Sequence, residues 1–227
     1  MKKLLFWMVL IVGIVALIGS CAKKDEETAA TAAADNTTST DNTTSTTSYI
    51  STTTTASGSI TMGDDTLSGV YASECLTSAS TIAFFKATGF WASEVNAYGQ
   101  VFVVTGSDNI SIELYAFTDT SCSNLSQSQK TVSDNVTVGS ASGSNYPVTY
   151  NNQTQALTVH TTAAETALET LYSNALDFIV GTPIELPVSG SGLRYGLWTL
   201  SGTTLYEASD STSATPTSAG TVPHVKQ

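Results

Sequence analysis

Most enzyme active sites are built from histidine, serine and carboxylate side chains. This 227-residue chain contains such residues, but their spacing matches no recognisable catalytic motif. Its two histidines, His160 and His224, are far apart in the sequence, and neither belongs to a zinc-binding pair. Residues 139–143 have the glycine spacing of a nucleophile elbow, but alanine stands where the nucleophile would be. Asp64 and Asp65 lack the spacing of an EF-hand loop. We therefore expect no metal, no cofactor and no enzymatic activity.

Cys21 offers a different chemistry, which is covalent attachment of lipid. It follows an uncharged apolar run, residues 4–19, and Lys2 and Lys3 precede that run. This order resembles the signal peptide of bacterial lipoproteins, in which a branched aliphatic residue and two small or aliphatic residues precede a lipidated cysteine. The resemblance implies cleavage before Cys21 and acyl chains, such as palmitate, on the new N-terminal residue.

The same residues imply a cellular location. Ala22, rather than aspartate, follows the lipidated position, which in Gram-negative sorting favours the outer membrane. We therefore expect a lipid-anchored protein of the bacterial cell envelope, at the outer membrane. Two alternatives stay open, an uncleaved membrane anchor and a secreted protein with a chance cysteine. The apolar run is shorter than the ~20 residues that a membrane-spanning helix needs.

The charge of the chain limits its partners. The formal net charge is −11, and removal of residues 1–20 takes away Lys2 and Lys3 and no acid, which leaves six basic and 19 acidic side chains, a net of −13. Such a chain lacks the basic patch that nucleic acid requires. It also lacks attraction for anionic lipid, so the acyl chains of Cys21 must supply the membrane affinity.

Two further cysteines, Cys75 and Cys122, lie nearly fifty residues apart. Disulfides persist outside the cytoplasm, so we expect this pair to be bonded, with two buried free thiols as the alternative. A catalytic thiol is not expected, because no Cys-His-Asx pattern surrounds either residue.

Aromatic side chains are the candidate ligand contacts. They could line a cavity inside a β-barrel, since apolar sites with few polar groups are typical binding pockets. The alternative is that they form the core of the domain. The residues selected as candidates are Trp91, Tyr115, Trp198 and Tyr206.

Three regions follow from composition. Residues 1–20 are the predicted lipoprotein signal peptide. Residues 21–59 are the lipidated cysteine and a Thr/Ser-rich tether, whose few apolar side chains predict disorder. Residues 60–227 are long enough, and apolar enough, for one β-rich globular domain.

The globular region has the patterns of many short strands. Residues 109–118 alternate clearly, with Ile110, Ile112 and Leu114 on one face and Glu113 among the residues of the other. Residues 163–177 carry apolar side chains at helical spacing and predict one amphipathic helix packed on the sheet. The further strand candidates are residues 67–75, 100–105, 130–138, 148–150, 156–161, 184–188, 193–200, 203–207 and 221–226.

This pattern predicts a mainly β fold, an antiparallel barrel with one amphipathic helix, and a β-sandwich is the alternative. Gly69-Val70-Tyr71 is similar to the Gly-x-Trp that begins lipocalin-like barrels, where the aromatic ring closes one end. In that family an arginine of a late strand packs over the ring. The resemblance implies that Tyr71 stands for the tryptophan and Arg194, the sole arginine, for that arginine. The predicted helix precedes the last hairpin, whereas in lipocalins it follows the barrel.

The function that these features predict is non-enzymatic. We expect a lipid-anchored envelope protein that binds a small apolar ligand inside its barrel. The alternative is a structural or adhesive surface lipoprotein that acts through contacts with other proteins, which would require an exposed apolar patch or an open strand edge.

Overall fold

The structure, a computed structural model, describes residues 49–188, 192–208 and 211–227. Cys21, the predicted signal peptide and the predicted tether up to residue 48 lie outside the described residues. The description below therefore concerns the globular region and the segment that leads into it.

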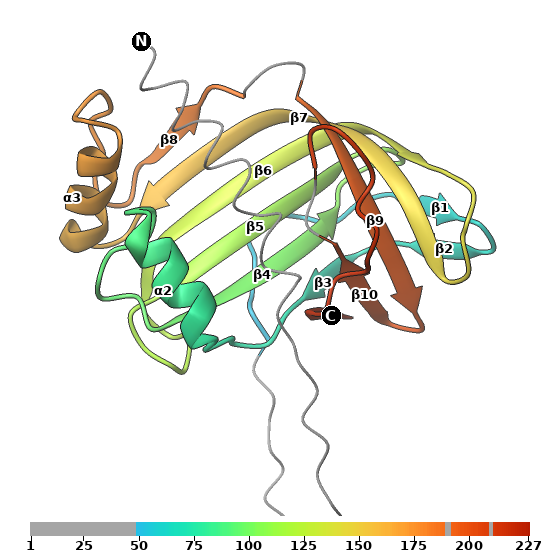
Figure 1. The fold of residues 1–227 in the computed structure, drawn as a ribbon, viewed down its shortest axis with the longest axis horizontal. Helices are drawn as coiled ribbons and strands as arrows, with labels where there is room; N and C mark the ends of the chain where they lie inside the picture. Colours follow the sequence, from blue (N-terminus) through green and yellow to red (C-terminus); the bar gives the residue numbers. More distant parts are fainter. Residues whose placement is uncertain (1–48, 189–191, 209–210) are drawn as a thin grey trace, which may run out of the picture.

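The core of the fold is a closed barrel of eight antiparallel strands (Figure 1). The ring closes where β6 pairs with β7 and where β11 pairs with β3. The lipocalin-like barrel predicted from the sequence is confirmed, and the sandwich alternative is wrong. The strands of the ring are β3 (Val70–Ala72), β4 (Ala97–Val104), β5 (Ile110–Phe117), β6 (Leu125–Val138), β7 (Asn145–Val159), β9 (Leu193–Ser201), β10 (Thr204–Glu207) and β11 (Pro223–Lys226).

Shorter elements cover the two ends of the barrel (Figure 1). A hairpin of β1 (Ile60–Met62) and β2 (Asp65–Leu67) lies at one end. Two helices, α2 (Ala79–Ala87) and α3 (Thr162–Leu171), lie at the other. One further strand, β8 (Pro183–Leu186), pairs with the second half of β7, whereas β9 pairs with the first half.

The helices differ from the sequence prediction. The predicted helix is α3, but it ends at Leu171 because Ser173 and Asn174 adopt positive φ angles of 55° and 56°. Helix α2 was not predicted, since its β-branched and aromatic residues favour a strand. Its start is fixed by Ser78, whose hydroxyl accepts a hydrogen bond from the backbone N–H of Thr81.

The predicted alternation of β5 is confirmed and decides which side chains face inward. Ile110 and Ala116 belong to the two clusters of buried side chains inside the barrel. Phe117 belongs to a third cluster, on the outer face of the sheet. Side chains alternate along a strand, and residues paired across neighbouring strands point to the same face. The pairings of β5 and β6 therefore show which residues of β4, β6 and β7 face inward.

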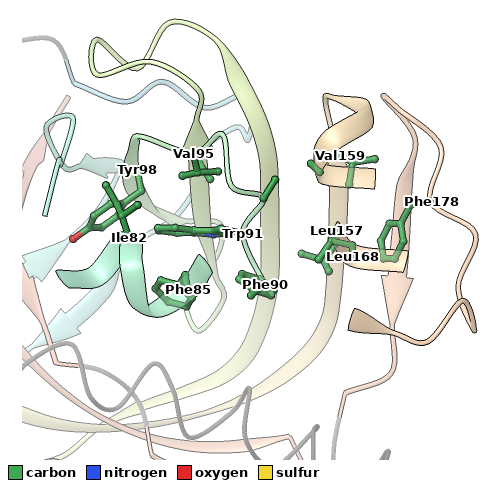
Figure 2. Close-up of a cluster of buried hydrophobic side chains, with 13 residues drawn as sticks. Ile82, Phe85, Phe90, Trp91, Val95, Tyr98, Leu157, Val159, Leu168 and Phe178 are labelled. Atoms are coloured by element: carbon green, nitrogen blue, oxygen red, sulfur yellow. The ribbon is translucent and has the colours of Figure 1, made fainter. Parts of the chain in front are cut away.

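Each end of the barrel interior is filled by its own cluster. The helix-side cluster packs Trp91 against Phe85, with ring centroids 4.3 Å apart, and Figure 2 shows Tyr98 beside them. The hairpin-side cluster surrounds Trp198, whose ring meets that of Phe102 edge-on at 5.1 Å. Burial of these large rings contributes much of the hydrophobic stabilisation of a domain of this size.

The folded region begins earlier than the sequence predicts. Residues 49–59, which we call the strap, lie along the outer face instead of continuing the predicted tether (Figure 1). Ile50 is buried and its backbone N–H donates to the carbonyl of Ser73 at 3.1 Å. At the other end of the strap, the N–H of Ser57 donates to the carbonyl of Val104 at 2.9 Å.

Candidate functional site

The candidate site is the middle of the inner face, between the two buried clusters. Two rows of inward-facing residues cross the strands there, and we call them the central rows. The strand register defines the first as Gln100, Leu114, Gln129, Leu157 and Ile184, and the second as Phe102, Ile112, Thr131, Gln155 and Leu186.

Solvent reaches most residues of the central rows although they face inward, while Phe102 and Leu157 are buried. Gln100, Gln129, Thr131 and Gln155 are all partly exposed, whereas the inward-facing residues of the adjacent rows are mostly buried. No hydrogen bond joins any of these four side chains to another described residue. The centre of the barrel therefore presents three amides and a hydroxyl whose donors and acceptors are available to a bound molecule.

The break between β8 and β9 lies beside these rows. Along Gln155–Thr158 the neighbour of β7 is β8, and along Asn145–Asn151 it is β9. Within the described ranges, β8 has no strand partner other than β7. The two residues that β8 contributes to the central rows, Ile184 and Leu186, are also partly exposed.

Three buried polar atoms have no hydrogen-bond partner among the described residues, and all belong to inward-facing residues. They are Gln127 Oε1, Trp198 Nε1 and His224 Nδ1. Gln127 precedes Gln129 by two positions on β6 and is 2% exposed, and its Nε2 donates to the carbonyl of Phe90 at 2.9 Å. Buried polar atoms in proteins are nearly always hydrogen-bonded, so such atoms mark places where water or a ligand binds.

His224 is buried in a setting that keeps it neutral. It lies opposite Leu205, a member of the hairpin-side cluster, and is 2% exposed. Burial lowers its pKa to about 4. Its imidazole is thus uncharged at neutral pH, and its position in the interior was not predicted from the sequence, which placed it near the end of the chain.

The four aromatic residues selected from the sequence do not converge. Trp91 lies in the helix-side cluster and Trp198 in the hairpin-side cluster. Tyr115 is on the outer face, and Tyr206 alternates with the inward-facing Leu205 and is partly exposed. Within the described structure these side chains are core and surface residues rather than a shared lining.

The cation over Tyr71 is not the one that the resemblance implied. Tyr71 is buried inside the barrel, and the Nζ of Lys226 lies 5.9 Å from its ring centroid. Lys226 is on the last strand, directly opposite Tyr71 in the register. Arg194 is buried on β9, opposite Tyr150. The cation that the structure places over the Tyr71 ring is therefore a lysine of the last strand.

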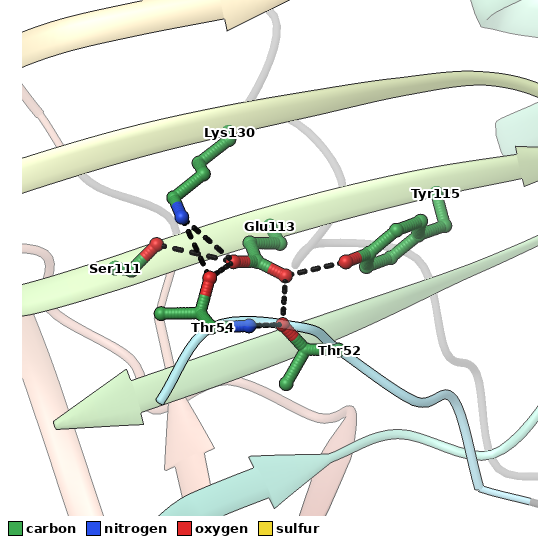
Figure 3. Close-up of polar contacts among 6 residues, drawn as sticks. All are labelled: Thr52, Thr54, Ser111, Glu113, Tyr115 and Lys130. Carbon is green, nitrogen blue, oxygen red and sulfur yellow. Dashed lines mark hydrogen bonds and ion pairs between the residues drawn. The ribbon is translucent and has the colours of Figure 1, made fainter. Parts of the chain in front are cut away.

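A second polar group lies on the outer face, where Glu113 holds the strap (Figure 3). Its carboxylate is 3% exposed and accepts hydrogen bonds from the hydroxyls of Thr52, Thr54 and Tyr115. Lys130 Nζ lies 3.7 Å from its Oε1 and donates to Thr54 Oγ1 at 2.6 Å.

These contacts shift the pKa of the Glu113 carboxyl and of the Tyr115 hydroxyl. Burial alone would raise the pKa of Glu113, but the hydrogen bonds from Thr52, Thr54 and Tyr115 and the charge of Lys130 bring it below the ordinary value. Burial, together with the hydrogen bond to Glu113 and its charge, raises the pKa of Tyr115. The outer-face group is therefore a charged, internally satisfied clamp rather than an acid–base site.

The predicted disulfide is present. Cys75 and Cys122 are bonded, with their Cα atoms 5.8 Å apart, and they close a loop with a sequence separation of 47. Asp119 shapes the turn before Cys122 by accepting hydrogen bonds from the backbone N–H groups of Ser121 and Ser123. This is a capped turn, in which an aspartate side chain binds the backbone N–H groups that follow it.

His160 lies on the far side of the barrel wall from the central rows. Its Nε2 is 3.2 Å from the hydroxyl of Ser128, and burial lowers its pKa.

Among the described residues no three histidine, cysteine or acidic side chains gather as metal ligands do. Nor does any described helix combine the length and apolar character needed to cross a bilayer.

Comparison with other proteins identifies no family. No family model matches the chain, and no curated protein matches it significantly. What the chain does is therefore inferred from its own residues.

Proposed function

We propose that this chain is a lipid-anchored protein of the bacterial cell envelope, delivered to the outer membrane, that binds a small ligand on the inner face of its barrel. The binding is non-enzymatic and uses no cofactor. Cys21 supplies the anchor, and the central rows supply the site. The cysteine lies outside the described residues, so the anchor rests on the sequence alone.

One observation carries the binding role. Four polar side chains face the interior of the barrel, are partly exposed, and have no hydrogen bond to any other described residue. A barrel interior with only a structural role gains stability from apolar side chains or from amides that bond to one another. Polar groups held inward without partners are instead typical of sites that complete their hydrogen bonds with a ligand.

The ligand role is tested by filling the site. In a Thr131→Trp variant, the indole occupies the central rows, and we expect the exported protein to lose the small molecules that organic solvent releases from the wild-type chain. Mass spectrometry of the two extracts makes the comparison. Thr137→Trp, at an exposed position of the same strand, is the matched control and should keep them. Identical extracts from all three proteins would reject the site.

The anchor is tested separately. The mature protein should begin at Cys21 and carry a diacylglycerol and an acyl group in its mass spectrum, and Cys21→Ser should move the protein to the soluble fraction. An unmodified Cys21, or a retained residue 1–20 segment, would contradict the anchor without bearing on the inner-face site.

The protein–protein alternative has one observation in its favour. The loop between α3 and β8 exposes two adjacent large apolar side chains, Ile179 at 57% and Val180 at 44%. It leads into β8, which has one strand partner among the described strands. If this surface binds another protein, Ile179→Ser/Val180→Ser should abolish co-purification of that protein and leave the small-molecule extract unchanged.

A further inference from the structure

We infer that the ligand of the central rows is an uncharged amphiphile, a molecule that joins hydroxyl or amide groups to an alkyl chain. This inference rests on the proposed binding function and specifies its ligand class. A monoacylglycerol or a fatty amide has the required chemistry. The following observations distinguish it from charged and from aromatic ligands.

The polar side chains of the central rows are all neutral and all able both to donate and to accept. Each glutamine offers two N–H donors and a carbonyl acceptor, and Thr131 offers a hydroxyl. Hydroxyl and amide groups of a ligand match this combination, because they too donate and accept. A carboxylate only accepts and an ammonium only donates, so either would leave part of the lining without partners.

Charge leads to the same conclusion. Neither central row contains an acidic or basic residue that would neutralise a charged group brought in from water. Burial of an unpaired charge is strongly unfavourable. The inward-facing cations that the register places nearest to these rows are Lys226 and Arg194. Lys226 lies opposite Tyr71, the neighbour of Phe102, and its Nζ lies over the Tyr71 ring and donates to the hydroxyl of Ser68. Arg194 is buried on β9 and donates to the carbonyl of Leu193 at 3.2 Å.

The side chain of Gln127 favours a ligand that carries a hydrogen-bond donor. Its Oε1 is buried at the edge of the rows and has no hydrogen-bond partner among the described residues, while its Nε2 is already committed to Phe90. Only a group that donates can complete this acceptor. A hydroxyl or an amide N–H does so, whereas a carboxylate oxygen placed there would repel it.

The aliphatic members of the rows define the other half of the ligand. Ile112, Leu114, Ile184 and Leu186 pack against the two clusters and keep part of their surface exposed on the same face as the amides. Phe102, which belongs to the second row, and Tyr98, the inward-facing residue that precedes Gln100 on β4, are buried in the end clusters and offer no free face for stacking. An alkyl chain therefore suits this surface better than a sugar ring or an aromatic group.

Four probes that each carry an eight-carbon chain test the inference on the exported full chain held in amphipol. They are monooctanoylglycerol, octanamide, octanoate and octylamine, with binding measured by titration calorimetry. We expect the two neutral probes to bind with a dissociation constant about tenfold or more below those of the charged probes. In the Gln129→Leu/Gln155→Leu variant this preference for neutral probes should disappear. Gln153 is exposed and lies on β7, as Gln155 does, so Gln153→Leu is the control and should retain the preference.

Every other outcome would reject one named part of the proposal. Tighter binding of octanoate or octylamine that is lost in the double variant would reject the neutral ligand and keep the inner-face site. Binding that the double variant leaves unchanged would reject the central rows as the site. Binding of no probe by the wild-type chain would reject this ligand class, and the extract comparison with Thr131→Trp would then decide the binding function by itself.

Discussion

The carboxylate of Glu113 accepts a hydrogen bond from the hydroxyl of Thr52 at 2.5 Å, although the two residues are 61 positions apart in the chain. This contact joins the strap to the outer face of β5. It places a buried charge where the strap crosses the sheet. Four hydroxyl groups donate to that charge, those of Thr52, Thr54, Ser111 and Tyr115.

Replacement of Glu113 should release the strap. In Glu113→Gln the hydroxyls of Thr52 and Thr54 lose a charged acceptor, and we expect the free energy of unfolding to fall by about 1–3 kcal/mol. Limited proteolysis should then cut within residues 49–59. Glu185→Gln, at an exposed position, is the control and should change neither result.

The effect of Glu113 should depend on pH in a defined direction. Because its folded-state pKa lies below the ordinary 4.5, it stabilises the folded protein above that pH, and this stability is lost as pH falls through the folded-state value. The difference in the free energy of unfolding between wild type and Glu113→Gln should therefore be largest at neutral pH and become smaller in acid. A difference that grows as pH falls would contradict the charged clamp.

His224 should make the whole domain sensitive to mild acid. Its folded-state pKa of about 4 lies below the ordinary 6.5, so the unfolded chain binds a proton more readily between these values. Stability is full above pH 6.5 and falls by about 3 kcal/mol as pH decreases to 4. His224→Leu should remove most of this loss in urea titrations across that range, and His160→Leu should leave most of it.

The disulfide should contribute through the length of its loop. A separation of 47 residues between Cys75 and Cys122 gives about 4 kcal/mol in the chain-entropy model. We expect Cys75→Ala/Cys122→Ala to unfold at correspondingly lower urea concentration. A reductant should lower the stability of the wild-type protein to about that of the variant and leave the variant unchanged.

Lys226 should stabilise the end of the barrel through its contact with Tyr71. Its Nζ also donates to the hydroxyl of Ser68 at 3.1 Å. Lys226→Met keeps the alkyl stem and removes the charge, which should cost about 0.5–1 kcal/mol. Lys226→Arg should retain the stability, since a guanidinium also binds the face of an aromatic ring. A loss of stability as large in Lys226→Arg as in Lys226→Met would reject the cation–ring contact.

The central rows should carry a measurable cost in stability. Gln129→Leu/Gln155→Leu replaces two inward-facing amides that have no described partner by apolar side chains of similar size. Thermal unfolding of the ligand-free protein should therefore occur at a higher temperature in this variant than in the wild type. A lower unfolding temperature would show that these amides stabilise the barrel.

Sequence alone predicted the features that depend on local pattern. The alternation of β5 is visible because Ile110, Ile112 and Leu114 are apolar and their outward neighbours are largely polar. The disulfide followed from the number of cysteines and the expected compartment. The contact between Lys226 and Tyr71 was not predicted, since only the register shows that Lys226 stands opposite Tyr71.

Features that depend on distant partners were missed. The strap has the Thr-rich composition of a tether, and its partner Glu113 is more than fifty positions away. On β6, residues 127, 129 and 131 face inward, but they are polar and most of their outward neighbours are polar too, so no alternation of apolar and polar residues marks the inner face. The inward-facing glutamines therefore look like surface residues until the barrel closes around them.

The strap also determines how mechanical load enters the domain. A pull on the chain from the N-terminal side acts first on the antiparallel bridge between Tyr49 and Glu74 and then on the contacts of Ile50 and Thr52. The first two contacts join the strap to the backbone just after β3, and the third joins it to the outer face of β5. A force applied to the chain before residue 49 would therefore load the contacts of residues 49–59 before it loads the barrel.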